Sequence, residues 1–230
     1  MSYYHRLYNS AKAFKYRQTD STLVPAASKV VCVGRNYLDH IKELGNAPSE
    51  KPVLFMKPST ALCDVENPIK LPRDLGACHN ELELAFLIDA KLKNANKEEC
   101  SDAVAGVGLS LDLTLRDVQD ELKKAGKPWE RAKAFDASCP ISGFVPLNGY
   151  HDDAFTFSLH INQVLKQAGD SKMMLHALIP LLQEITAHFT LLPGDVVLTG
   201  TPKGVGPLHE GDSLRLTLDN HFTVSTTVCA

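Results

Sequence analysis

ELELAFLI at residues 81–88 and VGLSLDLT at residues 107–114 are the two stretches from which the fold class follows. In both, apolar side chains recur at every second position, which is the pattern of a β-strand. Glu81 and Glu83 therefore project to one face of the first strand, and four large apolar side chains project to the other. Asp112 interrupts the apolar pattern of the second strand, where an unpaired charge would be costly.

These three carboxylates predict a metal site. No cluster of Lys or Arg accompanies them in the neighbouring sequence, so a divalent cation is the expected counter-charge. Ligands that are all oxygen favour Mg²⁺, Mn²⁺ or Ca²⁺ over Zn²⁺. The alternative interpretation is that Glu81 and Glu83 lie on a solvated strand face and that Asp112 is an internal hydrogen-bond acceptor.

The bulk composition is that of an ordinary globular protein. The chain has 230 residues, a hydrophobic share of 44% and a net charge of -3. This favours one catalytic domain, expected over residues 29–230, and excludes the basic surface that nucleic acid or anionic lipid would require. No apolar run approaches the ~20 residues of a membrane-spanning helix, so no membrane partner is expected.

Cysteine usage and the N-terminal residues bear on location. The six cysteines are scattered without a C-x-x-C pair, which indicates reduced thiols in a reducing compartment and predicts a cytoplasmic protein. Residues 1–28 are predicted to form an N-terminal extension or an edge strand. Within them, residues 1–25 carry basic side chains and no acid before Asp20, so targeting to the mitochondrial matrix is the alternative.

The predicted strands outnumber the predicted helices and do not alternate with them, which argues against a doubly wound sheet or a (β/α)₈ barrel. The expected fold is β-rich α+β, a mixed β-sandwich or roll with a few peripheral helices. Strands are expected at 29–34, 52–58, 81–88, 103–114, 154–161 and 195–200, with a final hairpin of 213–218 and 222–228. Helices are expected at 36–45, 116–125 and 173–189, and Pro180 should break or kink the last of these.

A histidine and a glutamate in the first predicted helix form a candidate catalytic pair. His40 and Glu43 are i,i+3 neighbours and share a helix face. A carboxylate beside an imidazole orients the ring and raises its basicity, which suits a general base. Read alone, the same spacing is more often a surface ion pair.

Three further segments carry candidate ligand-binding side chains. Arg116 and Gln119 follow Asp112 directly and are suited to holding a carboxylate or carbonyl, although a solvated helix face has the same pattern. Lys133 lies among apolar residues and is either a partly desolvated anion-binding group or a snorkelling surface lysine. In residues 198–206, glycines and threonine hydroxyls allow close approach to a ligand, but the spacing of a phosphate-binding loop is absent.

Taken together and in order, these segments resemble the fumarylacetoacetate hydrolase family. The resemblance covers residues 29–210 and is closest to the short, single-domain acylpyruvases and fumarylpyruvate hydrolases. Asn162-Gln163 departs from the Asn-Gly that often forms a tight turn in the family, so a different loop is expected there. The resemblance is carried by GRNYLDHIKE (34–43), PVLFMKPSTAL (52–62), HNELELAFLI (79–88), the run from Leu109 to Phe144, and LPGDVVLTGTPKGVGPL (192–208).

The resemblance implies a role for each candidate residue and a β-rich roll that forms a homodimer. It implies that Glu81, Glu83 and Asp112 bind Mg²⁺ or Mn²⁺. It implies that His40 and Glu43 activate water on a segment that closes over the substrate as a lid, with Lys133 beside the metal. The residues whose segments line the ligand pocket are Arg35, Arg116, Gln119 and Thr201.

The function implied is metal-dependent hydrolysis of the C–C bond of a 2,4-diketo acid, such as fumarylpyruvate or acetylpyruvate, to pyruvate and a carboxylic acid. The same site would support decarboxylation of oxaloacetate or isomerisation of a 2-hydroxy-dienedioate, because each reaction needs the same enolate. A small keto acid is the expected partner in all three cases. A non-catalytic scaffold that only holds a keto acid is the remaining alternative.

Overall fold

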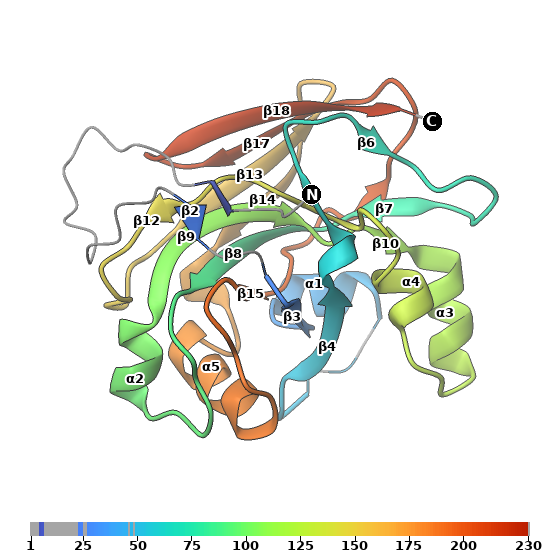
Figure 1. Ribbon diagram of the computed structural model, residues 1–230. Helices are drawn as coiled ribbons and strands as arrows, with labels where there is room; N and C mark the ends of the chain where they lie inside the picture. The colour runs from blue at the N-terminus through green and yellow to red at the C-terminus, as the bar shows by residue number, and fades with distance from the viewer. Residues whose placement is uncertain (1–4, 7–22, 25–26, 46, 48, 230) are drawn as a thin grey trace.

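A computed structural model gives the fold of the chain (Figure 1). It describes residues 5–6, 23–24, 27–45, 47 and 49–229. The prediction for residues 1–28 lies largely outside the described residues. Of that region the structure gives β1 (His5–Arg6) and β2 (Leu23–Val24), which pair antiparallel with each other.

The largest sheet forms the centre of the molecule. Its strands are β3 (Lys29–Gly34), β4 (Val53–Pro58), β5 (Leu62–Asp64), β8 (Leu82–Ile88), β9 (Val104–Leu111), β11 (Cys139–Ile141), β12 (Val145–Pro146) and β15 (Val196–Leu198). Their order is β4-β3-β15-β8-β9-β11-β5, and β12 pairs with β9. The sheet is mixed, since β15 runs parallel to β3 and antiparallel to β8. The predicted β-rich roll is thus the observed architecture.

A second sheet covers one face of the first and is seen at the top of Figure 1. It contains β6 (Ile69–Lys70), β13 (Thr156–Ile161), β14 (Val164–Asp170), β17 (Ser213–Leu218) and β18 (Phe222–Cys229). The strand order is β14-β13-β17-β18-β6. A small third sheet has the order β10-β7-β16 and is built from β7 (Cys78–Asn80), β10 (Thr114–Leu115) and β16 (Gly206–Pro207).

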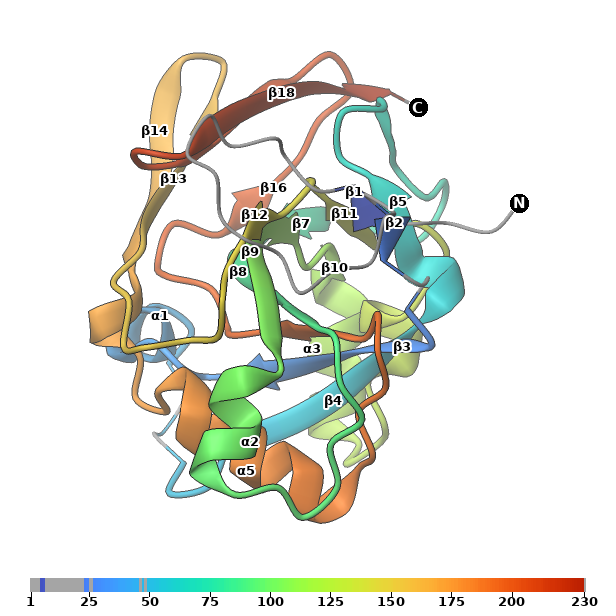
Figure 2. The same ribbon diagram turned by 60° about the vertical axis from the view of Figure 1, so that its left-hand side comes forward.

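The helices are peripheral, as Figures 1 and 2 show. They are α1 (Leu38–Glu43), α2 (Lys97–Asp102), α3 (Arg116–Lys124), α4 (Glu130–Lys133) and α5 (Leu178–His188), with 3₁₀ turns at η1 (Ser59–Ala61) and η2 (Ser171–Met173). In Figure 1, α2 and α5 lie at one end of the sheets and α3 and α4 at the other. Within the described part of the chain, no helix has the length and apolar character needed to cross a bilayer.

Two of the helix predictions need correction. The helix expected over 173–189 begins only at Leu178, so Pro180 lies in its first turn and breaks nothing. Proline is tolerated there because the amide hydrogens of the first turn have no partner within the helix. The helix expected over 36–45 is shorter, Leu38–Glu43, and is followed by Gly45 at φ 63°.

Strand β8 is buried on both faces, which excludes the solvated face considered from the sequence. Leu84 and Phe86 pack in one apolar cluster with Phe157 of the second sheet. The opposite face carries Ala85 and Leu87, which pack in a second cluster within the roll. Any charged side chain on that second face is therefore removed from bulk water and needs a partner.

Both hairpin turns are tight. Asn162 and Gln163 have φ values of 51° and 68° and connect Ile161 to its pairing partner Val164. Gln163 adopts the left-handed conformation that a two-residue turn requires, so Asn162-Gln163 forms a tight turn without a glycine. The predicted three-residue loop between β17 and β18 is confirmed, with Asn220 at φ 62°.

Candidate metal centre and active site

The antiparallel pairing of β8 with β9 brings the three predicted metal ligands together. Leu82 is opposite Leu111, so Asp112, one residue beyond β9, lies beside the start of β8. The backbone amide of Asp112 donates to the carbonyl of Glu81 at 2.8 Å, which fixes this register. Glu81, Glu83 and Asp112 are all buried, and each offers one carboxylate oxygen within 4.8 Å of the other two. The sequence-based triad is one geometric cluster.

Cations surround this cluster, contrary to what the neighbouring sequence indicated. Lys133 Nζ lies 2.8 Å from Glu81 Oε2 and 2.6 Å from Asp112 Oδ2. The Arg116 guanidinium pairs with the other oxygen of Glu81. Lys57 Nζ lies 2.8 Å from Asp112 Oδ1. Arg116 follows Asp112 closely in sequence but pairs with Glu81, and Lys57 and Lys133 come from other segments of the chain. In the folded chain, three carboxylates therefore face three positive charges.

Lys57 was missed by sequence reasoning. It is the penultimate residue of β4 and is fully buried, at 0% exposure. Its ammonium also donates to the carbonyl and hydroxyl oxygens of Ser138, at 3.0 and 3.1 Å, and to the carbonyl of Lys133. A lysine inside an otherwise apolar strand was the only signal available in the sequence, and a buried lysine almost always has a charged partner.

The buried charges shift one another's pKa values in opposite directions. Burial disfavours ionisation of Glu81, but the charges of Lys133 and Arg116 outweigh it and hold the pKa of that carboxyl well below its usual value. Burial and the nearby Asp112 and Glu81 raise the pKa of Glu83. Burial also acts against the charge of Lys133, yet Asp112 and Glu81 raise its pKa, so Lys133 is a permanent ammonium at neutral pH.

The predicted His40–Glu43 pair is present, with a buried imidazole and an exposed carboxylate. His40 Nδ1 lies 3.1 Å from Glu43 Oε2 on α1, and His40 is 6% exposed. Glu43 Oε1 accepts a hydrogen bond of 2.9 Å from the amide of Gly204. The glutamate thus orients the imidazole and also fastens α1 to the loop 198–206.

Hydrogen bonds hold the side chains of three predicted substrate-binding residues, Arg116, Gln119 and Thr201. Arg116 Nη1 donates to Gln119 Oε1 at 2.6 Å. Thr201 Oγ1 donates to the carbonyl of Leu82 at 2.8 Å and accepts from Gln167 Nε2 at 2.8 Å. Gln167, on β14, was not predicted as a site residue. Its Oε1 also accepts a hydrogen bond of 2.8 Å from the backbone amide of Leu82. Gln167 and Thr201 together hold the loop 198–206 against β8.

One cleft collects almost all of these side chains. It encloses about 470 Å³, including its open mouth. Nine of the ten predicted site residues line it, namely Arg35, His40, Glu81, Glu83, Asp112, Arg116, Gln119, Lys133 and Thr201, and Glu43 contacts it through His40. Sequence reasoning missed three further lining residues that matter below, Phe55, Lys123 and Trp129.

The donor set fits a hard divalent cation. All three ligands are carboxylates, which suits Mg²⁺ or Mn²⁺. Glu83 is oriented by a second contact, because its Oε2 accepts a 2.7 Å hydrogen bond from the amide of Gly200. Outer contacts of this kind hold a ligand oxygen in place for the ion.

Comparison with known proteins agrees with this geometry. The curated relative "Oxaloacetate tautomerase YcgM" from Escherichia coli (strain K12) is 55% identical over 196 residues, covering 84% of this chain and 90% of the relative. A putative fumarylacetoacetate hydrolase family protein from Yersinia pestis CO92 superposes with a TM-score of 0.88 at 49% identity, covering 98% of this chain and 100% of that one.

A third relative carries a metal ion. The crystal structure of fumarylpyruvate hydrolase from Pseudomonas aeruginosa in complex with Mn²⁺ and pyruvate superposes with a TM-score of 0.87 at 29% identity, covering 99% of this chain and 96% of that one. The family model described as "Fumarylacetoacetate (FAA) hydrolase C-terminal" matches residues 29–229. The buried carboxylate cluster thus lies in a chain that belongs to the fumarylacetoacetate hydrolase family of enzymes.

Proposed function

We propose that this protein is a Mg²⁺- or Mn²⁺-dependent oxaloacetate tautomerase, which interconverts the enol and keto forms of oxaloacetate. The observation that carries the proposal is the position of Lys133. Its permanent ammonium touches two of the three metal-ligand carboxylates at 2.8 and 2.6 Å and lines the cleft. An enolate oxygen formed there would meet a fixed positive charge, which is the largest contribution to many reactions of this type.

The relatives support this choice over the hydrolase that the sequence favoured. The relative from E. coli, named an oxaloacetate tautomerase, is 55% identical to this chain, whereas the fumarylpyruvate hydrolase from P. aeruginosa is 29% identical. The human relative named "Oxaloacetate tautomerase FAHD1, mitochondrial" is 42% identical over 199 residues. The relatives therefore favour the alternative expected from the sequence, which is enolate chemistry on oxaloacetate or a related acid, over hydrolysis.

The proton balance of the reaction suits the residues of the cleft. In ketonisation the enol oxygen loses a proton and C3 gains one. With Glu43 accepting from Nδ1–H, Nε2 of a neutral His40 is the free acceptor. His40 takes the hydroxyl proton and returns it to C3, which is adjacent to the carbon that bears the oxygen. The Lys133 ammonium stabilises the negative charge that develops between the two transfers.

A bound metal would supply Lewis-acid polarisation and a template for the substrate. Glu81, Glu83 and Asp112 would hold it, while Arg116 and Gln119 bind substrate oxygens on the same side of the cleft. Helix α1 is fastened through Glu43 to Gly204, and its buried His40 and Ile41 line the cleft beside these charges. Each electrostatic contact is stronger in such a site than in water.

A second candidate is hydrolysis of an acylpyruvate, and the His40–Glu43 contact of 3.1 Å favours it. Hydrolysis requires a base that activates water, and this pair has the geometry of one. Decarboxylation of oxaloacetate requires neither water nor a proton transfer before the C–C bond breaks.

The three reactions differ in their products. Tautomerisation releases no fragment, hydrolysis releases pyruvate and a carboxylic acid, and decarboxylation releases pyruvate and CO₂.

The deciding experiment separates these products. Enol oxaloacetate is followed by its ultraviolet absorbance, and pyruvate release is measured from oxaloacetate, acetylpyruvate and fumarylpyruvate. Each assay is run with Mg²⁺, with Mn²⁺ and with excess chelator. We expect chelator-sensitive loss of the enol signal that outpaces any pyruvate release. Faster cleavage of a diketo acid would establish the hydrolase, and pyruvate from oxaloacetate alone would establish a decarboxylase.

His40→Ala tests the proton carrier in whichever reaction is found. Positioned acid–base groups contribute about 10²–10⁴-fold, so kcat should fall by that order. Mn²⁺ affinity, measured by calorimetry, should stay unchanged because His40 is not among the three ligands. His188→Ala, on the exposed end of α5, is the matched control. Near wild-type turnover in His40→Ala would show that His40 moves no proton in the rate-limiting step.

A further inference from the structure

Lys123 lines the cleft but is not among the cations paired with the carboxylate cluster. Lys57, Lys133 and Arg116 already match the three buried carboxylates. Lys123, in the last turn of α3, lines the same cleft, and its side chain is 23% exposed. Its contact with Asp120 is loose, at 3.9 Å, and the Asp120 side chain is 53% exposed. A pair of this kind contributes little in water, so the Lys123 ammonium remains available to an anion.

An aromatic wall connects Lys123 to the centre of the site. The rings of Phe55 and Trp129 lie 6.0 Å apart. Lys133 Nζ lies 5.2 Å from the centre of the Phe55 ring, and Lys123 Nζ lies 5.6 Å from the Trp129 ring. Both rings line the cleft. The wall thus has one ammonium group at its inner end and another at its outer end, and each is steadied by an aromatic face.

Positive charges lie on the cleft side of Lys123. Partial burial and the positive charge of Arg116 lower the pKa of Lys123, and Lys133 acts in the same direction, while Asp120 and Glu81 act against them. Several like charges therefore converge on one region that water reaches only in part. A ligand carboxylate placed there would relieve this repulsion, and such convergent cations attract and orient anions.

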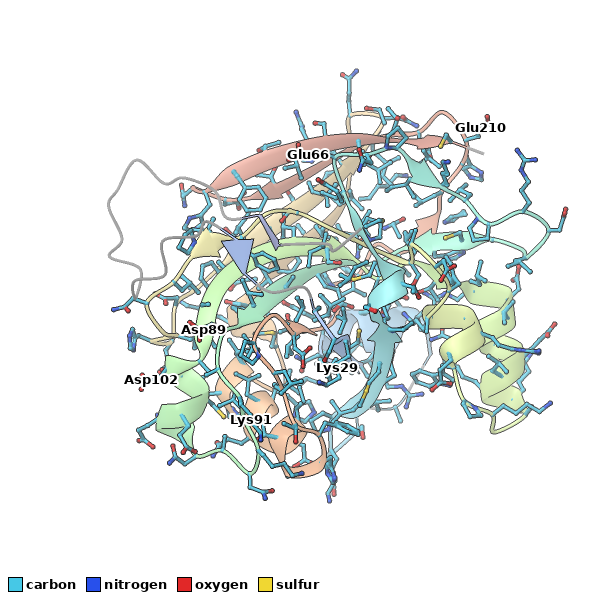
Figure 3. All side chains as sticks on the ribbon, in the orientation of Figure 1. Lys29, Glu66, Asp89, Lys91, Asp102 and Glu210 are labelled. Atoms are coloured by element: carbon cyan, nitrogen blue, oxygen red, sulfur yellow. The ribbon has the colours of Figure 1, made fainter. Side chains whose placement is uncertain are left out.

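The six charged residues labelled in Figure 3 do not line this cleft. Asp89, Lys91 and Asp102, labelled in Figure 3, lie at the α2 end of the molecule, away from α3. Glu66 and Glu210 lie near the second sheet. The positive region at Lys123 is distinct from these mixed or acidic parts of the surface and opens into the same cleft as the metal ligands.

We propose that Lys123, set against the face of Trp129, binds the second carboxylate of a dicarboxylic keto acid whose first carboxylate lies at the metal ligands. This inference rests on the proposed function and names its substrate class. The subsite selects diacids such as oxaloacetate over keto acids with an uncharged end, such as acetylpyruvate. Lys123 is a substrate-binding residue and takes no part in proton transfer.

The test compares two substrates that differ by one charge. Oxaloacetate and its C4 methyl ester both tautomerise at C2 and C3, but only oxaloacetate offers a second carboxylate. Lys123→Gln should lower kcat/KM for oxaloacetate by about 10- to 100-fold, the range of a charge-assisted hydrogen bond. The same variant should leave the methyl ester within about twofold of the wild type. Lys124→Gln, on the exposed side of α3, should change neither substrate.

Inhibition gives a second readout that does not depend on turnover. Under this proposal oxalate, which lacks the two carbons between the carboxylates of oxaloacetate, binds at the metal ligands alone, so its inhibition constant should be the same in the wild type and in Lys123→Gln. Lys123→Arg should retain most of the preference for the diacid, because the charge is kept. An equal loss with oxaloacetate and with its methyl ester would overturn the proposal. So would an unchanged diacid preference, and Arg35→Gln would then be the variant to examine.

Failure of the subsite is distinguishable from failure of the proposed function. If the wild type turns over neither substrate, the tautomerase proposal fails. The subsite is then tested by calorimetric binding of oxaloacetate and its methyl ester in the presence of Mg²⁺. Tighter binding of oxaloacetate than of its methyl ester by the wild type, lost in Lys123→Gln, would support the subsite without the tautomerase. Equal affinities of the wild type for the two compounds would contradict the subsite too.

Discussion

At the scale of single residues, Lys57 shows that a buried charge needs a charged partner, whereas an exposed one does not. It has the same formal charge as the exposed Lys51 six residues earlier, but it is fully buried and is paired with Asp112. Asp112 therefore has an ammonium on each oxygen, Lys57 on Oδ1 and Lys133 on Oδ2. The carboxylate is held in one orientation by this double contact.

Removing the Lys57 charge should strongly destabilise the fold. Lys57→Met keeps much of the side-chain volume but leaves one oxygen of Asp112 without its cation. Breaking a buried pair in this way costs about 3–5 kcal/mol. Urea unfolding in the presence of chelator measures the loss, and Lys51→Met should lie within about 0.5 kcal/mol of the wild type. The double variant Lys57→Met/Asp112→Asn should lose less than the sum of the single variants, and strict additivity would mean that the two charges do not interact.

At the scale of elements, the loop 198–206 is held from both sides. Helix α1 holds it through Glu43, which accepts the amide of Gly204. Strand β14 holds it through Gln167, which donates to Thr201 and to the carbonyl of Pro202. The loop carries the amide of Gly200 that orients Glu83, so its position couples helix α1 to the carboxylate cluster.

Two glycines with similar backbone conformations should respond differently to alanine. Gly204 has φ +102° and a Cβ there would lie 1.8 Å from the carbonyl oxygen of Lys166, whereas Gly211 has φ +89° and no atom within 4 Å. Gly211→Ala should cost about 1–2 kcal/mol from conformation alone. Gly204→Ala should cost at least about 2 kcal/mol more, because β14 backbone must shift.

Activity should separate these variants further. Gly204→Ala displaces the amide that holds Glu43, so kcat should fall in parallel with stability, while Gly211→Ala should retain its kcat. Urea unfolding and turnover under saturating substrate provide both quantities. Equal costs for the two substitutions would contradict the close approach of the loop to β14.

At the scale of the whole molecule, burial of the thiols links stability to pH. Burial raises the pKa of Cys139 to about 11 and that of Cys78 to about 11. An unfolded thiol has a pKa of about 8.5. Above that pH the unfolded chain loses thiol protons that the folded chain keeps, so the free energy of unfolding falls as pH rises from about 8.5 towards 11.

Cys139→Ala should make the protein less sensitive to alkaline pH. Between about pH 8 and pH 10 a single buried thiol with this shift contributes a loss of about 2 kcal/mol. In Cys139→Ala the free energy of unfolding should fall by about 2 kcal/mol less between pH 8 and pH 10 than in the wild type. The comparison uses only this decrease, so the stability of the variant at pH 8 does not affect it. Cys229→Ala, at a half-buried position, is the control. Equal pH dependence in Cys139→Ala and the wild type would show that the Cys139 thiol titrates normally.

Local patterns predicted the strands and the short-range pairs. Alternation in ELELAFLI placed Glu81 and Glu83 on one face of β8, and i,i+3 spacing placed His40 beside Glu43, because strand and helix geometry repeat over a few residues. The same patterns misplaced the start of α5, because apolar residues before Leu178 continue the helical pattern while the backbone there leaves the 3₁₀ turn η2 and forms a β-bridge from Met174 to Tyr37.

The sequence by itself determined the strands, the shared face of Glu81 and Glu83 and the histidine–glutamate pair, since each depends on neighbours a few positions apart. The roll and the inclusion of Asp112 among the metal ligands were predicted from the order of the segments along the chain and their resemblance to the family. Only the tertiary structure decided which charges meet. Lys57, Arg116 and Lys133 reach the carboxylates from β4, α3 and α4, and Gln167 reaches Thr201 from β14. Contacts between distant segments depend on strand order and packing, and the periodicity within one segment does not specify either. These contacts form the cleft that contains the carboxylates.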